Sequence, residues 1–106
     1  MYRYNLKDFK KGWIVGAFDP TIINTNDVEV AIKIYNKGDS EPAHLHKIAT
    51  EITVVLSGII SINGCSYYPN EIIKIMPNEI VSFESITDSK TVVVKFPGIS
   101  NDKYVV

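Results

Sequence analysis

The middle of the chain, from Gly38 to Gly58, reads GDSEPAHLHKIATEITVVLSG and decides how the rest of the sequence is interpreted. It contains both histidines of the protein, His44 and His46, two residues apart. Side chains at positions i and i+2 of a strand point to the same face, so in an extended segment both imidazoles reach one point. Glu51 begins the next apolar run and brings a carboxylate alongside. The stretch therefore predicts a cluster of His44, His46 and Glu51.

Such a cluster has the chemistry of a metal site. Two imidazoles and one carboxylate, with coordination positions left open, suit a divalent transition metal such as iron, manganese, nickel or zinc. Open positions accept water or substrate, which a catalytic site requires. We therefore predict His44, His46 and Glu51 as metal ligands, with His44 and His46 also as candidate catalytic residues. A His-x-His pair by itself is more often a pair of exposed polar residues, so the residues around the pair decide whether a metal site is expected.

The composition predicts an all-β fold in a single domain spanning residues 1–106. Isoleucine (16) and valine (11) far outnumber leucine (3) and alanine (4), and β-branched residues favour strands over helices. Residues 28–35 alternate at period two, with Val28, Val30, Ile32 and Ile34 on one face and Glu29, Lys33 and Tyr35 on the other. A chain of 106 residues falls within the usual size of one domain, and no linker interrupts it.

Turn signals divide the sequence into short strands. Asn63-Gly64 is a strong hairpin signal, because both central residues of a type I′ turn need a positive φ. The sequence Pro-Asn-Glu-Ile occurs at 69–72 and again at 77–80, which brackets a strand between two turns. Strands at this spacing indicate a sandwich or a small antiparallel barrel. The expected strands cover residues 28–35, 52–56, 59–62, 65–68, 72–76 and 91–96, with an early arm at 13–18.

Charge and cysteine content exclude several classes of partner. The net charge is −1, from 11 basic and 12 acidic residues spread along the chain, so we expect neither nucleic acid nor a membrane as partner. The uncharged stretch 52–70 is broken by three turn signals and does not read as a membrane span. The single cysteine, Cys65, permits no internal disulfide, and residues 1–11 do not resemble a signal peptide. We expect a cytoplasmic location.

The central stretch resembles the first motif of the cupin superfamily. That motif is a glycine, five residues, His-x-His, three or four residues, a glutamate, six residues and a glycine, and Gly38, His44, His46, Glu51 and Gly58 match every fixed position. The resemblance implies a small antiparallel β-barrel (a jelly roll, or double-stranded β-helix) with its site inside. It also implies that the two histidines and the glutamate bind one metal ion, together with a histidine from a second motif.

The second cupin motif is largely lost. Aligned on Pro77, its metal-binding histidine is replaced by Ser82, and the chain has no third histidine. At most three strong protein ligands remain, so we expect the metal to be weakly held or absent. The two ends of the chain are similar to short stand-alone cupins of no assigned activity, which extends the resemblance to nearly the whole chain.

Three functions stay open at this point, and with them the question of whether the protein is an enzyme. It is a metal-dependent cupin that binds or transforms a small polar molecule, a metal-free sugar-nucleotide isomerase or epimerase, or a non-enzymatic ligand-binding module. In the second case a histidine is the base, because its pKa lies near neutrality, and Tyr35, Tyr67 or Tyr68 is the acid.

The sequence also bears on assembly. Exposed sheet edges are a liability unless they are covered, and the N-terminal segment and the strand near Thr91 are candidates for pairing across a two-fold axis. We therefore expect a homodimer. The sequence Asp102-Lys103-Tyr104 is most simply a frayed polar tail.

Overall fold

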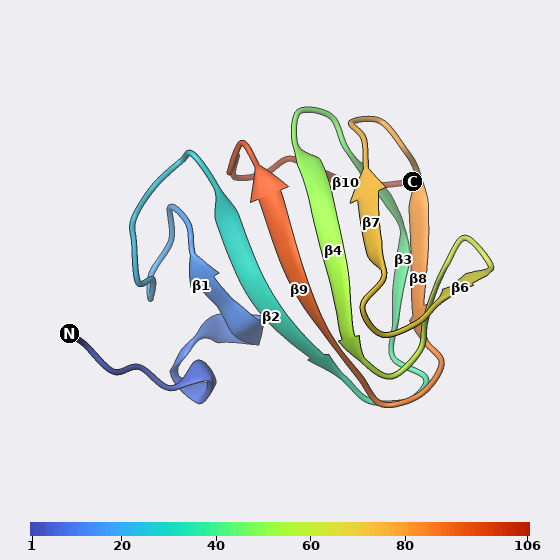
Figure 1. The fold of residues 1–106 in the computed structure, drawn as a ribbon. Helices are drawn as coiled ribbons and strands as arrows, with labels where there is room; N and C mark the ends of the chain where they lie inside the picture. The colour runs from blue at the N-terminus through green and yellow to red at the C-terminus, as the bar shows by residue number, and fades with distance from the viewer.

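Two five-stranded antiparallel sheets face each other in the structure, a computed structural model that describes residues 1–106 (Figure 1). In spatial order the first sheet contains β1 (Trp13–Val15), β2 (Glu29–Tyr35), β9 (Ser89–Phe96), β4 (Thr50–Ser57) and β7 (Ile72–Ile75). The second contains β10 (Lys103–Val105), β3 (Ser40–His46), β8 (Val81–Ser85), β5 (Ile60–Ile62) and β6 (Cys65–Tyr67). Two short 3-10 helices, η1 (Leu6–Asp8) and η2 (Lys10–Gly12), precede them. The predicted all-β barrel is confirmed. No helix combines the length and the apolar character that a membrane crossing requires.

The turns follow the sequence signals closely. Asn63 and Gly64 both have positive φ, 52° and 78°, and join β5 to β6 with Ile62 opposite Cys65. The two Pro-Asn-Glu-Ile sequences form the same turn twice, with φ of 74° at Asn70 and 71° at Asn78. In each turn the glutamate, Glu71 or Glu79, accepts a 2.7 Å hydrogen bond from the backbone N–H three residues earlier. The sequence echo is therefore a repeated turn.

β2 is oriented with its polar face inward. Ala31 is fully buried, and Glu29, Lys33 and Tyr35 on the same face line an interior cavity. Ile34 on the opposite face is 65% exposed. β2 therefore presents charged groups to the interior and aliphatic groups to the outside, the reverse of the usual half-buried strand.

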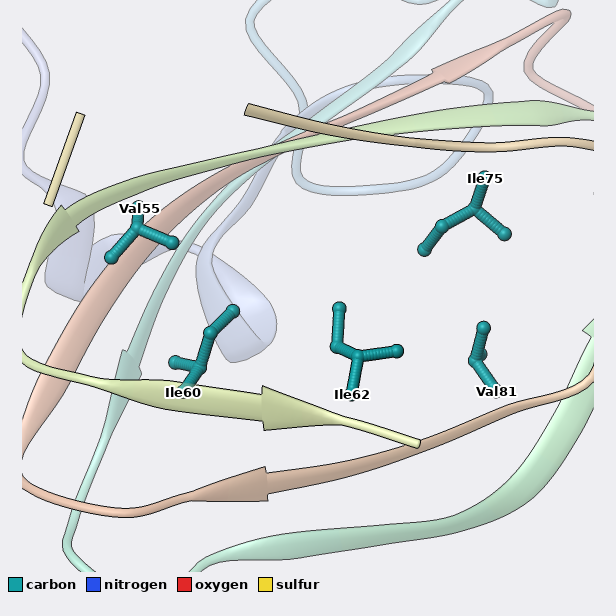
Figure 2. Close-up of a cluster of buried hydrophobic side chains, with 5 residues drawn as sticks. All are labelled: Val55, Ile60, Ile62, Ile75 and Val81. Carbon is teal, nitrogen blue, oxygen red and sulfur yellow. The ribbon is translucent and has the colours of Figure 1, made fainter. Parts of the chain in front are cut away.

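The apolar core fills one part of the space between the sheets. Val55 and Ile75 come from the first sheet, and Ile60, Ile62 and Val81 from the second, with their side chains directed toward one another (Figure 2). Burying an aliphatic side chain of this size contributes about 1.5–3 kcal/mol. The cluster holds the two sheets together and leaves the rest of the interior to polar side chains.

Truncating the core should weaken the fold measurably. Ile60 is fully buried, so we expect Ile60→Ala to lower the free energy of unfolding by about 2–5 kcal/mol through lost transfer energy and the cavity left behind. Urea unfolding followed by circular dichroism measures this. The control is Ile23→Ala, at an exposed position, which should change stability by less than about 0.5 kcal/mol. Equal effects of the two variants would contradict this placement of the core.

The C-terminal segment is an ordered strand, and the expectation of a frayed tail is wrong. β10 pairs with β3, with Lys103 opposite His46 and Val105 opposite His44. Asp102 is only 4% exposed, and its carboxylate accepts hydrogen bonds of 2.9–3.2 Å from the backbone N–H groups of Lys47, Ile48 and Ala49. These bonds anchor β10 beside the strand that carries both histidines.

Candidate functional site

A cavity of about 380 Å³ lies between the two sheets, beside the apolar core. Its volume is near the lower end of the range for small-molecule sites. Its wall includes both histidines, three glutamates and four lysines, with Trp13 and Phe18 on one side. The glutamates are Glu29, Glu41 and Glu51, and the lysines are Lys11, Lys33, Lys95 and Lys103.

The two histidines lie next to each other on the inner face of β3. Both are 5% exposed, and their ring centroids are 5.6 Å apart with the rings nearly perpendicular. His44 Nδ1 is 2.9 Å from the carbonyl oxygen of Pro42. A carbonyl oxygen only accepts, so Nδ1 carries the proton in this contact and Nε2 is the ring nitrogen left to bind a ligand. Histidines that bind a metal through one ring nitrogen typically donate a hydrogen bond of this kind from the other nitrogen.

His46 is held in the neutral state. Burial, reinforced by the positive charge of Lys95 and by His44, lowers the pKa of His46 to about 4. Its Nε2 atom is buried and has no hydrogen-bond partner. A buried polar atom without a partner is costly, and a bound ion or a catalytic role is among the features that explain one. His46 therefore offers a neutral imidazole nitrogen to the cavity, and His44 lies beside it.

Glu51 reaches the same cavity from the opposite sheet. It lies on β4, between Lys95 of β9 and Ile75 of β7, and its Oε2 accepts a 3.0 Å hydrogen bond from the Thr53 hydroxyl. No group of three or more His, Cys, Asp or Glu side chains is arranged to hold a metal ion. The ligand set of His44, His46 and Glu51 thus shares one cavity but remains a prediction.

The other residues singled out in the sequence either line the cavity or lie outside it. Ser82, at the position of the missing histidine, is exposed, and its inward-facing neighbour Val81 is apolar, so β8 supplies no ligand. Tyr35 lines the cavity of the histidines and packs against Phe83 at 4.6 Å between ring centroids. Tyr67 and Tyr68 do not line this cavity, and Cys65 is exposed.

Sequence reasoning missed the charged wall opposite the histidines. Lys33 and Lys95 project from the first sheet, and each ammonium lies over the ring of Trp13, at 5.3 and 4.8 Å from the ring centroid. The signal was present as the polar side of the alternation in β2. It could not be read because alternation separates two faces without saying which one lies inside.

Comparison with known proteins supports the fold. No family model and no curated protein matches the chain. A double-stranded β-helix protein from Klebsiella pneumoniae superimposes with a TM-score of 0.70 at 20% identity, over 77% of this chain and 72% of the other. A cupin protein from Bacteroides fragilis superimposes with a TM-score of 0.59 at 25% identity, over 76% of this chain and 75% of the other. The bacterial pirin YhhW from Escherichia coli, in complex with nickel(II), gives 0.68 and 18%, over 83% of this chain and 39% of the pirin. The chain has the cupin fold that its central motif predicts.

Proposed function

We propose that the protein binds a small polar molecule in the barrel cavity, at a divalent transition metal held by His44, His46 and Glu51. The observation that carries the proposal is the pair of buried imidazoles on a cavity wall, His44 with its Nδ1 proton fixed by Pro42 and the neutral His46 with an unpartnered Nε2. Neutral imidazole is the form that binds a metal. The nickel complex of the similarly folded pirin supports the same chemistry here.

The residues present fit a metal in their donor chemistry, with one adjustment. Glu51 is hydrogen-bonded to Thr53, so its carboxylate would turn from that hydroxyl to join the histidines. A bound metal would supply Lewis-acid polarisation to a ligand oxygen. The chain itself supplies the rest: Pro42 orients the His44 ring, and the walls of the cavity exclude bulk water. The lysines of the wall oppose a cation and the glutamates favour it, so we expect weak metal binding.

Metal content tests the proposal directly. Protein purified without an affinity metal or a chelator is incubated with iron, manganese, nickel or zinc in turn, dialysed, and measured by elemental analysis. We expect close to one equivalent of one of these metals, lost in His44→Ala because one of only two imidazoles is gone. Glu51→Gln should bind at least about tenfold more weakly if the carboxylate is a ligand.

The control is Ser82→Ala, which alters the aligned position of the second motif but lies on the outside. This variant should keep its metal. Metal retained in His44→Ala, or no metal taken up by the unmodified protein, would contradict the metal site.

The alternative functions have weaker support. A metal-free isomerase needs a histidine base whose pKa lies near the working pH, and burial lowers the pKa of His46 to about 4, which makes it a poor proton acceptor. Tyr35 is the one tyrosine candidate in the same cavity. Ligand binding without catalysis uses the same cavity and the same residues as the main proposal.

We also propose that two copies of the chain pair through the outer face of the first sheet. Strand register places ten aliphatic or aromatic residues side by side on this face: Val30, Ile32, Ile34, Ile52, Val54, Leu56, Ile72, Val92, Val94 and Phe96. Ile34, Ile52, Leu56, Ile72 and Phe96 are exposed. The charged strand residues of the face are Lys74, on the edge strand β7, and Lys90, at the start of β9. Both lie at the margin of the apolar surface, where a long side chain extends its ammonium group to water.

The extent of this face supports a dimer. Its apolar residues run across four neighbouring strands, β2, β9, β4 and β7, and a stable interface needs a continuous surface of about 800 Å² from each partner. Large contiguous apolar patches on soluble proteins mark interaction sites. This arrangement differs from pairing through the sheet edges, which the sequence alone favoured, because the face and not the edge carries the apolar residues.

A further inference from the structure

Lys33 and Lys95 direct positive charge into the cavity from neighbouring strands. Lys33 lies on β2 and Lys95 on β9, and both line the cavity wall that faces the histidines. Both ammonium groups lie within 5.3 Å of the centroid of the Trp13 ring, so the two charges share one aromatic platform. A cation over the face of a tryptophan is stabilised by about 0.5–2 kcal/mol. Trp13 thus holds two cations close together, where they repel each other.

Neither lysine has a carboxylate partner. The ion pair of the structure joins Lys103 and Glu41 at 4.0 Å. Glu29 and Glu51 lie directly opposite Lys95 in the register, yet neither forms an ion pair with it. The ammonium group of Lys33 donates one hydrogen bond, of 3.1 Å, to the carbonyl of Lys11. Each ammonium has three N–H donors, so most of the donors of this pair are free.

The surroundings make these free ammonium groups costly. Burial lowers the pKa of Lys33, and Lys11, Lys95 and Lys103 lower it further while Glu41 opposes them. Four lysines outnumber three glutamates on the cavity wall, which favours an anion over a cation as ligand at this end of the cavity. Glu29 and Glu41 act on Lys95 and Lys33 at longer range, without an ion pair. A partly buried cation without a paired carboxylate is stabilised by an anion that enters the cavity.

We infer that Lys33 and Lys95 form an oxyanion subsite, and that the ligand of the cavity is a small organic anion carrying a carboxylate or phosphate group. The two ammonium groups hold the anionic end, and the remainder of the molecule extends toward His44 and His46 on the facing sheet. The inference rests on the proposed function for the histidine end only. The lysine end stands on the geometry of the wall, because an oxyanion bridging two ammonium groups needs no metal.

Trp13 makes the subsite directly observable, because it is the one tryptophan of the chain. Metal-free, full-length protein is titrated at low ionic strength with succinate, with inorganic phosphate, and with 1,4-butanediol as the uncharged analogue of succinate. Trp13 fluorescence is followed, with calorimetry as a second measurement. We expect saturable binding of at least one anion and none of the diol. Preference for succinate assigns a carboxylate ligand, and preference for phosphate assigns a phosphorylated one.

Variants locate the binding. Lys33→Gln and Lys95→Gln should each raise the Kd about tenfold or more, since each removes a charge-assisted hydrogen bond. Lys37→Gln removes the same charge from an exposed turn outside the cavity and should leave the Kd unchanged. Circular dichroism confirms that each variant is folded.

The outcomes separate this inference from the proposed metal site. Failure of both anions to bind the metal-free protein, or equal binding by the Lys33 and Lys95 variants, overturns the oxyanion subsite and leaves metal binding by the histidines untouched. If anion binding persists in His44→Ala and the unmodified protein takes up no metal, the result supports the oxyanion subsite and contradicts the metal site.

Discussion

Replacing Asp102 with alanine should destabilise the protein by about 3 kcal/mol or more, since the change removes a buried carboxylate that accepts one buried and two partly buried backbone hydrogen bonds. The carboxylate accepts hydrogen bonds from three consecutive backbone N–H groups, at Lys47, Ile48 and Ala49. Without it these donors lose their acceptors, and an unsatisfied buried group costs about 1–3 kcal/mol. Denaturant unfolding measures the change. The exposed Asp27→Ala, whose side chain makes no hydrogen bond, should change stability by less than about 0.5 kcal/mol.

The same carboxylate should make stability depend on acid. Burial raises the pKa of Asp102, but the backbone N–H donors and His46 together outweigh burial and lower it below the usual value. The folded protein therefore binds the Asp102 proton less readily than the unfolded chain. This contribution to stability is present above the ordinary carboxyl pKa of about 4 and is lost as the pH falls toward the lowered value. In Asp102→Asn the free energy of unfolding should fall less between about pH 5 and pH 2 than in the unmodified protein. Denaturant unfolding at each pH measures this, and the same fall in both proteins would contradict this role.

Loss of Asp102 should also loosen the histidine strand. β10 covers the edge of β3 along His44 to His46, and Asp102 fixes the chain just before β10. Hydrogen exchange of the β3 amides should therefore quicken in Asp102→Ala more than exchange in β4. The residue acts as a positioning residue for the site, through the backbone that carries the two imidazoles.

The local features of this fold were predictable from sequence because each depends on short-range physics. The His44–His46 pair follows from period two, and the Asn63-Gly64 hairpin follows from the positive φ that its turn requires. The jelly-roll barrel was expected from the resemblance of residues 38–58 to the first cupin motif. Each of these signals spans at most about twenty residues of chain.

What the sequence did not reveal depends on contacts between distant segments. Asp102 finds its donors more than fifty residues away, so nothing around it distinguishes an anchored carboxylate from a polar tail. Whether Glu51 turns to Thr53 or to the histidines depends on how two sheets face each other. The inward direction of Lys33 depends on the whole barrel, because only the packing of the two sheets decides which face of β2 lines the cavity.

The reversed burial of β2 leads to the prediction for the outer face of the first sheet. Ile52 lies near the centre of that face, opposite Val94 of β9 and Lys74 of β7, and is exposed in a single chain. In a dimer each large aliphatic side chain buried there contributes about 1.5–3 kcal/mol. We expect sedimentation velocity to give twice the mass of one chain at micromolar concentration.

Ile52→Lys should convert that dimer to a monomer, with the dimer Kd raised about a hundredfold or more, because an ammonium would be buried against an apolar face without a counter-charge. The fold should survive, since the new side chain is exposed in the monomer and lysine is tolerated at the neighbouring Lys74. Ile23→Lys makes the same change at an exposed position outside the sheet and should remain dimeric. An unmodified protein that is monomeric at micromolar concentration would rule out this interface. Dimers that persist in Ile52→Lys would place the contact on another surface, with the sheet edges the next surface to test.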